Sequence, residues 1–469
     1  MLHSKKTDYL MESIREGRTM ARGEKLNLIV GLSVPSMLAQ ISTVMMFFID
    51  ASMVGHLGAA ASASIGLVES TTWLIGSLLS AAATGFSVQV AHFIGANDFA
   101  RARQVFRHAL VCGLAFSLLV MILGSAIHDR LPYWLGGGDD IAAGSSKYFL
   151  IYCLTLPFVF LYHISETMLK SAGNMQTPSV MAVLVCVSDV AFNYLFIYAL
   201  KLGVAGAAFG TAAAYICISL PNLWLCACRN KILDLRQDHI RFHWVGAYLR
   251  NACKISIPIA IQNILMSGAQ IVSTMIVAPL GNIAIAAHSF AITAESLCYM
   301  PGYGIGDAAT TLVGQTHGAG RTDLCRQFAY MTVGLGMAVM AMMGAVMYAF
   351  APEMMGVLSP VASICDLGSH CLRIEAFAEP FFAASIVTYS VCVGAGDTFK
   401  PAAINLCTMW LVRLTLAYAL SKSHGLEGVW IAMAVELTTR GILFLVRLVR
   451  GSWMRSFQMR GDIKETDEC

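Results

Sequence analysis

The stretch PSMLAQISTVMMFFIDASMVGHLG (residues 35–58) has a modified copy, PIAIQNILMSGAQIVSTMIVAPLG (residues 258–281), later in the chain. Both stretches begin with proline and end with glycine, and they lie 223 residues apart. Twelve prolines among 469 residues would give about 0.2 proline-to-proline matches at this spacing by chance, whereas three are present. Further pairs at the same spacing are Pro157 and Pro380, Pro178 and Pro401, Gly95 and Gly318, and Gly173 and Gly396. The chain is therefore an internal duplication.

The composition indicates a membrane protein. Hydrophobic residues make up 57% of the chain and charged residues 13%, and the mean hydropathy is +0.66, which is too apolar for a soluble chain of this length. Twelve apolar segments each run for about 20 residues, enough to cross about 30 Å of hydrocarbon. We expect an all-α integral membrane protein with twelve transmembrane helices in two pseudo-symmetric six-helix lobes, related by a parallel repeat.

Basic residues predict the orientation. Of the 31 lysines and arginines, 24 fall in alternate segments that would face one side, five face the other side and two lie inside helices. Because basic residues are retained in the cytoplasm, both termini are expected there, in a multi-pass protein of the bacterial inner (plasma) membrane. The net charge of +3 follows from this asymmetry and implies no nucleic-acid partner.

The repeat and the polar stretches divide the chain into five parts. We expect a cytoplasmic N-terminal tail at 1–25, a first lobe at 26–228, a cytoplasmic inter-lobe linker at 229–254, a second lobe at 255–450 and a cytoplasmic C-terminal tail at 451–469. The N-terminal tail lacks the apolar core and cleavage site of a signal peptide. With Tyr9, Leu10 and Ile14 among basic residues, it fits either the membrane surface or solvent.

Motifs for other chemistry are absent from the sequence. No HExxH, GxSxG or CxxC motif occurs, and the twelve histidines show no metal-ligand spacing. Most cysteines lie in apolar runs as small packing residues. Cys365 and Cys371, near the outer end, are expected as free thiols, with a disulfide as the alternative. An enzyme is not expected, and Gly206 and Gly210 indicate a close-packing face between helices.

Intramembrane polar residues in the first half suggest an ion site. At a rise of about 1.5 Å per residue, four side chains reach a similar height in the membrane: Asp50, Asp189, Asn193 and Thr211. Their counterparts 223 residues later include Ser273 for Asp50 and Val412 for Asp189, so the second half does not copy the acids. The two negative charges of a buried carboxylate pair repel each other, so the pair would take up a proton or a small cation. The alternative is that Asp50 caps its helix or pairs with Lys201.

Charged residues of the second half have a different pattern. Arg413 and Glu436 come to matching depth and are expected to form an ion pair that stabilises this half. Arg440 follows Glu436 by one turn and is expected to join the same network. Glu295 in the second half and Glu69 in the first reach the middle of the membrane. Each of them either lines a cavity or has a structural role. For the acids nearer helix ends, the default expectation is side chains that extend toward the membrane surface, and these acids are Asp307, Glu166 and Glu379.

Several ordered motifs resemble one transporter family. They are residues 35–58, VAHFIGANDFARARQ (90–104) with its echo LVGQTHGAGRTDLCRQ (312–327), GVAGAAFGTAAAY (203–215) and VGAGDTFKP (393–401). Together they resemble the multidrug and toxic compound extrusion (MATE) transporters over nearly the whole chain. The resemblance implies two six-helix lobes around a V-shaped central cavity, and export of organic cations and amphipathic drugs by antiport with H⁺ or Na⁺.

The resemblance also assigns residues. Asp50 matches the helix-one aspartate of the family, and Thr211 matches a threonine of the amino-lobe cation site. Asp189 followed by Asn193 exchanges the two groups of the DinF-like branch, which leaves H⁺ or Na⁺ open as the coupling ion. Met266 stands where the NorM-like branch carries a glutamate, so the chain resembles the DinF-like branch more closely. The expected candidates for the substrate cavity are Glu295, Glu69, Gln40, Met266 and Gln262.

The predicted function is cation-coupled antiport of organic cations or amphipathic drugs, with membrane lipids around a monomer and no cofactor except the coupling ion. A lipid-linked oligosaccharide flippase of the same superfamily is the alternative. Such a cavity would need several cations for phosphate, whereas only two arginines lie inside predicted helices. An intramembrane enzyme is the alternative of a different class.

Overall fold

The structure is a computed structural model that describes residues 5–237 and 242–455. Within these ranges the regular elements are all helices, which confirms the predicted all-α class. Three pieces of the predicted tails and linker lie outside the described residues: 1–4, 238–241 and 456–469.

The chain divides into two compact units, and each is described by itself. Unit 1 comprises Met1–Glu16 and Ile41–Ala260, and unit 2 comprises Gly17–Gln40 and Ile261–Cys469. Two long helices are shared between the units, with one part of each helix in unit 1 and the other part in unit 2: α2 (Arg22–Gly55) and α9 (Gly246–Val277).

The other elements follow in chain order. Unit 1 contains α1 (Lys5–Arg15), α3 (Ala59–Gly95), α4 (Phe99–Ile127), α5 (Leu131–Trp134), α6 (Asp139–Ser171), α7 (Gln176–Asn193), η1 (Tyr194–Ala199), α8 (Gly203–Trp224) and η2 (Leu225–Arg229). Unit 2 contains η3 (Ala278–Leu280), α10 (Asn282–Gly318), α11 (Thr322–Leu358), α12 (Ala362–Ala376), α13 (Glu379–Gly394), α14 (Phe399–Cys407), η4 (Thr408–Arg413), α15 (Leu414–Arg450) and η5 (Ser452–Arg455).

Twelve membrane spans can be traced in the described residues. Ten helical runs are long and apolar enough to cross a bilayer, and the bent pair α12–α13 makes one more span. One of the ten, Phe399–Arg450, has 52 residues, far more than the roughly 20 that a bilayer requires. It is divided at Gly425, whose φ of 58° is left-handed, so it counts as two spans.

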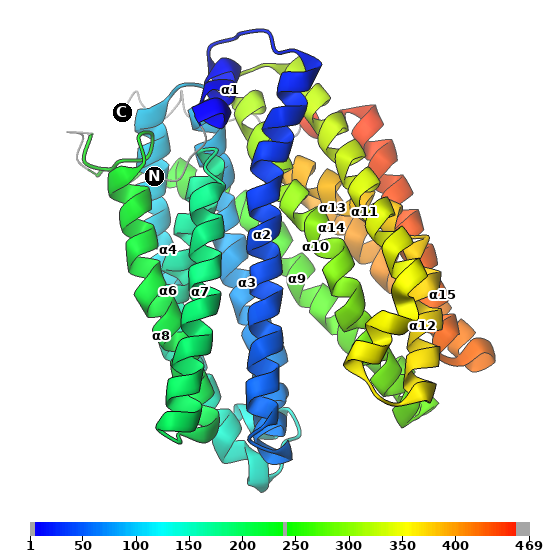
Figure 1. Cartoon of the computed structure of the whole chain (residues 1–469). Coiled ribbons are helices and arrows are strands. Elements are labelled where there is room, and N and C mark those ends of the chain that lie inside the picture. The colour runs from blue at the N-terminus through cyan, green and yellow to red at the C-terminus, as the bar shows by residue number, and fades with distance from the viewer. Residues whose placement is uncertain (1–4, 238–241, 456–469) are drawn as a thin grey trace. The chain divides into compact units, whose positions relative to one another are not determined.

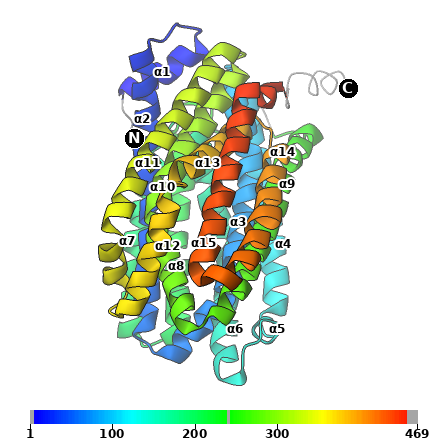
Figure 2. The same ribbon diagram turned by 90° about the vertical axis from the view of Figure 1, so that its right-hand side faces the viewer.

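Each unit is a helix bundle with its own packing. In unit 1, α6 packs against α3, α4 and α8, and α7 packs against α8; Figure 1 shows α4, α6, α7 and α8 running alongside one another. In unit 2, α10 packs against α11 and α13, and α13 also packs against α15, an arrangement that can be followed in Figure 2. The apolar side chains of these helices are therefore covered either by neighbouring helices or by lipid.

The repeat is preserved in backbone conformation. Gly58 and Gly281, which precede α3 and α10, have φ of 107° and 96°. Gly173 and Gly396, just beyond the ends of α6 and α13, have φ of 84° and 80°. These angles favour glycine over residues with a Cβ, so the paired glycines mark the same turns in both units.

The part of the N-terminal tail before Gly17 packs on unit 1. It forms the helix α1, in which Leu10 and Ile14 are buried. The side-chain amide of Asn97 donates to the Arg15 carbonyl oxygen at 3.1 Å, and the Arg15 guanidinium lies over the Phe99 ring. Leu10 and Ile14, for which the sequence left the membrane surface and solvent open, therefore face the protein, whereas Tyr9 is exposed.

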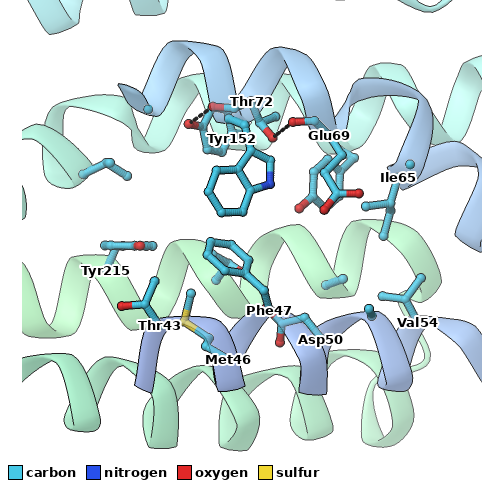
Figure 3. A pocket seen from close by; sticks show the side chains of 18 of the residues that line it. Thr43, Met46, Phe47, Asp50, Val54, Ile65, Glu69, Thr72, Tyr152 and Tyr215 are labelled. Atoms are coloured by element: carbon cyan, nitrogen blue, oxygen red, sulfur yellow. Dashed lines mark hydrogen bonds between the residues drawn. The ribbon is translucent and has the colours of Figure 1, made fainter. Parts of the chain in front are cut away.

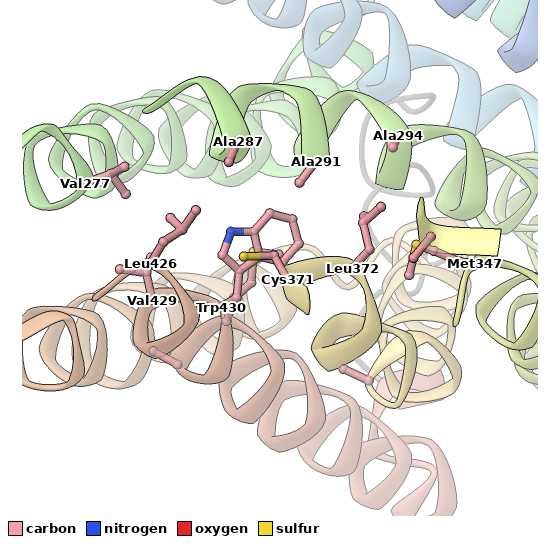
Figure 4. Close-up of a cluster of buried hydrophobic side chains, with 14 of the residues drawn as sticks. Val277, Ala287, Ala291, Ala294, Met347, Cys371, Leu372, Leu426, Val429 and Trp430 are labelled. Atoms are coloured by element: carbon pink, nitrogen blue, oxygen red, sulfur yellow. The ribbon is translucent and has the colours of Figure 1, made fainter. Parts of the chain in front are cut away.

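A core of unit 2 surrounds one tryptophan. Trp430 of α15 is fully buried among the alanines of α10 and the side chains Cys371 and Leu372 of α12, as Figure 4 shows. The indole N–H donates to Nδ1 of the buried His288 at 3.2 Å. The helices α10, α12 and α15 therefore pack together around this side chain.

Candidate functional site

Three of the predicted ion-site residues are joined by hydrogen bonds within unit 1. The side-chain amide of Asn193, the last residue of α7, donates to Asp50 Oδ1 of α2 at 2.8 Å. The same amide donates to Asp189 Oδ2, one turn earlier on α7, at 2.9 Å. Thr211 of α8 lies beside Asp189. The structure therefore brings all four predicted side chains together.

Glycines of α8 permit this arrangement. A Cβ added at Gly210 would overlap the Asn193 side-chain oxygen, and one added at Gly206 would lie 2.8 Å from the Phe196 carbonyl oxygen. The helix α8 can therefore approach α7 and η1 closely, as expected for small residues four positions apart. Directly after Asn193 the helix widens into the π-helical turn η1, a distortion that is frequent at functional sites.

The charges of the group are not balanced by a basic side chain. Asp50 makes no ion pair with Lys201 among the described residues. Asp189 is fully buried, and its Oδ1 and the Oδ1 of Asn193 have no hydrogen-bond partner in the described part of the chain. Two carboxylates thus share the neutral Asn193 amide without a basic partner in a largely buried place, an arrangement that is costly unless a proton or a cation joins them.

The donor set fits a small hard cation. It consists of carboxylate, amide and hydroxyl oxygens, the ligands that such ions prefer. No group of three or more His, Cys, Asp or Glu side chains suited to a metal occurs in residues 5–237 and 242–455. A Na⁺ ion at this position would therefore depend on the neutral oxygens of Asn193 and Thr211 in addition to the two aspartates.

A cavity of about 410 Å³ opens beside the group, inside unit 1. Asp50, Asn193 and Thr211 line it, whereas Asp189 is not among its lining residues. In Figure 3, Glu69 lies on the α3 side of the pocket and Asp50 on the α2 side. The predicted cavity residue Glu69 therefore shares one cavity with the ion-site residues.

Aromatic side chains form much of the cavity wall. Phe47 of α2 and Trp73 of α3 face each other with ring centroids 4.5 Å apart. Tyrosine side chains complete the wall, namely Tyr148, Tyr152 and Tyr215. No lysine or arginine is among the described residues that line the cavity. The cavity thus combines apolar rings with acidic groups, a combination suited to organic cations.

The second half differs from the first at positions that line the cavity. Five lining residues, Val54, Thr72, Tyr148, Tyr152 and Ala207, have buried counterparts 223 residues later, namely Val277, Glu295, Cys371, Glu375 and Trp430. At one of them, the small Ala207 is exchanged for the bulky, fully buried Trp430. Four of these five positions therefore carry a different residue in the second half of the duplication.

The remaining predicted cavity residues lie in unit 2. Gln40 donates from Nε2 to Asp307 Oδ2 at 3.3 Å, and Gln262 Oε1 accepts from Asn405 at 3.3 Å. Met266 packs against the apolar cluster that includes Met409. The structure does not bring these three residues into the cavity of unit 1.

In unit 2, Glu436 pairs with Arg440 instead of with Arg413, the partner expected from depth, and the three residues belong to a larger buried group. Arg440 Nε lies 3.2 Å from Glu436 Oε1, and the Arg413 guanidinium contacts the Met433 sulfur at hydrogen-bonding range. Arg413 also interacts electrostatically with Glu436 and with Glu295, which is buried. Glu295 is thus placed beside an arginine rather than in the cavity of unit 1.

Two further acids belong to this group, of which the sequence reasoning did not single out Glu375 and expected Glu379 at the membrane surface. Glu375 and Glu379 are both 0% exposed, and their carboxylate oxygens have no hydrogen-bond partner among the described residues. Glu379 therefore does not extend toward the surface as expected. Both acids lie at the 59° bend between α12 and α13, and the only sequence signal nearby is Pro380. Cys365 and Cys371, as expected, are free thiols.

The chain is similar to known transporters. A family model described as MatE matches residues 35–195 and 258–419. The "Probable multidrug resistance protein NorM" of Thermotoga maritima is 24% identical over 445 residues, which cover 93% of this chain and 95% of that protein. The protein of the same name from Pseudomonas aeruginosa is 26% identical over 438 residues, covering 89% and 88%.

Solved structures share the fold. A crystal structure of a MATE protein in complex with MaL6 has a TM-score of 0.88 at 20% identity and covers 97% of this chain and 100% of that one. A mutant of the Vibrio cholerae MATE transporter VcmN has a TM-score of 0.84 at 17% identity, with 95% and 98% covered.

Proposed function

Because this chain belongs to the MatE family, we propose that it exports organic cations or amphipathic drugs by antiport with H⁺ or Na⁺. Relatives described as multidrug resistance proteins support small-molecule export. We place the protein as a monomer among the lipids of a bacterial inner membrane, with both termini and the linker at residues 229–254 in the cytoplasm, on the distribution of basic residues.

One observation carries the coupling proposal: the single Asn193 amide that joins the carboxylates of Asp50 and Asp189. A proton or Na⁺ that enters this group reduces the repulsion between the two acids. The group can then contract, and α2, α7 and α8 move with it because α2 and α8 each contribute one of the four side chains and α7 contributes two. The ion and the substrate therefore bind to different arrangements of the same helices.

The two bound species affect each other reciprocally. If the coupling ion lowers the affinity for the substrate by some factor, the substrate must lower the affinity for the ion by the same factor. Entry of the ion from outside then favours release of the drug, and entry of the drug from inside favours release of the ion. Alternating access between the two sides converts this antagonism into antiport.

We assign the substrate's charge to Glu69. This residue lines the cavity on α3, away from the Asn193 amide that holds the aspartates. The facing rings of Phe47 and Trp73 provide flat apolar surfaces that attract cations. Ion and drug would thus use different acids of one cavity.

The flippase alternative is less well supported. A phosphate headgroup would need basic side chains, and the described lining of the cavity contains neither lysine nor arginine. The presence of Met266, where the NorM-like branch carries a glutamate, supports our proposal of a place nearer the DinF-like branch of the family.

Reconstitution in liposomes tests the proposal. The purified protein is given a cationic dye and either a proton gradient or a Na⁺ gradient, imposed separately. We expect dye movement against its own gradient with one of the two ions, and loss of this movement when that ion gradient is dissipated. Transport that is insensitive to both gradients would contradict antiport.

A further inference from the structure

The helix that carries Asp50 is fastened at its other end by a second aspartate. The inner half of α2, up to Gln40, belongs to unit 2, whereas the outer half from Ile41, with Asp50, belongs to unit 1. Pro35 lies within the inner half, and because proline has no N–H, one helical hydrogen bond is missing near the transition. The helix α2 is therefore a single element with two attachments.

The attachment to unit 2 is made at Asp307 of α10. The Ser36 hydroxyl donates to Asp307 Oδ2 at 2.6 Å, and the Gln40 amide donates to the same oxygen at 3.3 Å. Ser36 and Gln40 are four residues apart and thus lie on one face of α2. A carboxylate that accepts two side-chain hydrogen bonds from one helix face fixes that face in rotation and in height.

Backbone packing supports the same contact. A Cβ added at Gly304, one turn before Asp307, would lie 2.6 Å from the backbone nitrogen of Met37. The backbones of α2 and α10 therefore touch beside the hydrogen bonds. Nearer the start of α2, Lys25 Nζ donates to Gln327 Oε1 of α11 at 2.5 Å, so the inner half is held at two levels.

The repeat shows that the aspartate is not part of the duplicated framework. The counterpart of Asp307 is Thr84, whose hydroxyl bonds the Ser80 carbonyl of its own helix at 2.9 Å. The counterpart of Ser36 is Ile259, which cannot donate a hydrogen bond. The first half has a glycine contact of its own, Gly85 against Ala252 of α9. The close packing is thus common to both halves, whereas the acidic attachment is present once.

We propose that Asp307 is a positioning residue of the transport cycle, which holds the inner half of α2 on unit 2 through Ser36 and Gln40. The outer half of the same helix responds to the ion at Asp50. A change of state must then either separate α2 from Asp307 or bend α2 between Pro35 and Ile41. This role rests on the proposed antiport function, and Asp307 is not among the described residues that line the cavity of unit 1.

The test measures position and turnover separately. Spin labels are introduced through non-canonical amino acids, because the chain has 14 cysteines, at Val30 of α2 and Tyr330 of α11, both exposed and both in unit 2. Distance distributions are compared for the full-length protein in liposomes and for the variants Asp307→Asn, Asp307→Ala and Ser36→Ala. Thr84→Val is the matched control at the repeat position.

We expect Asp307→Ala to raise the population of a second, longer distance about fivefold or more, and Ser36→Ala to raise it less. Ethidium turnover, kcat, should fall about tenfold with KM within about twofold, since the cavity is untouched. Asp307→Asn keeps an acceptor oxygen and should fall between wild type and Asp307→Ala. Thr84→Val should match wild type in both measurements.

Two results would overturn the proposal. One is a wild-type distance distribution in both Asp307→Ala and Ser36→Ala, and the other is a shifted distribution with unchanged turnover. Because the distances are measured without a transport assay, they show whether Asp307 holds the inner half of α2 even if the proposed coupling at Asp50 proves wrong. A variant that does not fold is recognised by size-exclusion chromatography, and the remaining variants then decide the question.

Discussion

The carboxylate of Asp50 and the side-chain amide of Asn193 lie 2.8 Å apart although 143 residues separate them in the chain. The same amide also donates to Asp189, which uses both of its hydrogens, and neither acid has a basic partner within residues 5–237 and 242–455. The contact links α2 to α7, and it adjoins a cavity with an acid of its own, Glu69.

The assignment of Glu69 predicts a change in substrate affinity. Glu69→Gln should raise KM for a cationic dye about tenfold, because one charge interaction in a low-dielectric cavity is lost. Its effect on an uncharged amphipathic dye of similar size should be within about twofold. Glu353→Gln, at an exposed position on α11, is the matched control. Equal losses for charged and uncharged dyes would show that Glu69 supports the fold instead.

The close approach of α8 predicts a cost at Gly210. The added methyl group of Gly210→Ala would overlap Asn193, so we expect destabilisation of about 1–3 kcal/mol and a weaker response to the coupling ion. Thermal unfolding in detergent measures the first effect. Gly334→Ala, where an added Cβ meets open space, should be neutral or stabilise by up to about 1 kcal/mol. A Gly210→Ala protein as stable and as responsive as wild type would contradict the packing described.

Much of the fold could be predicted because its signals are local. Apolar segments of sufficient length show the spans, and paired glycines and prolines show the duplication. The height of a residue in the membrane also follows from its position along a helix. This estimate was enough to group Asp50 with Asp189, Asn193 and Thr211, which the structure places side by side.

Other features depend on tertiary contacts that no local pattern reports. Pro157 and Pro380 are repeat counterparts, yet α6 continues through the first while α12 and α13 bend by 59° near the second. The bend buries Glu375 and Glu379. The attachment of Asp307 to Ser36 was likewise hidden, because the sequence does not say which helix the inner half of α2 contacts.

The buried tryptophan of unit 2 predicts a large loss of stability. Trp430→Ala should reduce the free energy of unfolding by about 3–5 kcal/mol, because the vacated volume cannot collapse fully. Trp430→Phe keeps most of the ring and loses the hydrogen bond to His288, for which we expect about 1 kcal/mol. Thermal unfolding of the two variants distinguishes packing from hydrogen bonding. Equal and small effects would argue against Trp430 as the centre of this core.

The buried charges of unit 2 predict an asymmetric effect. Arg413→Met removes a cation that faces Glu436 and Glu375, and we expect a loss of about 3–5 kcal/mol because buried acids are left uncompensated. Arg373→Met, at a more solvated guanidinium that stacks over Tyr348, should cost about 1 kcal/mol or less. If Arg413→Met unfolds like wild type but loses transport, Arg413 acts in the transport cycle rather than in stability.

The most direct test of the account is the response of Asp50→Asn to an imposed ion gradient in liposomes. Asparagine keeps the size and an acceptor oxygen for Asn193 and removes the charge. We predict gradient-driven ethidium transport lower by at least about tenfold, with a melting temperature within about 3 °C of wild type. Full gradient-driven transport by a folded Asp50→Asn protein would contradict the claim that this carboxylate carries the coupling ion.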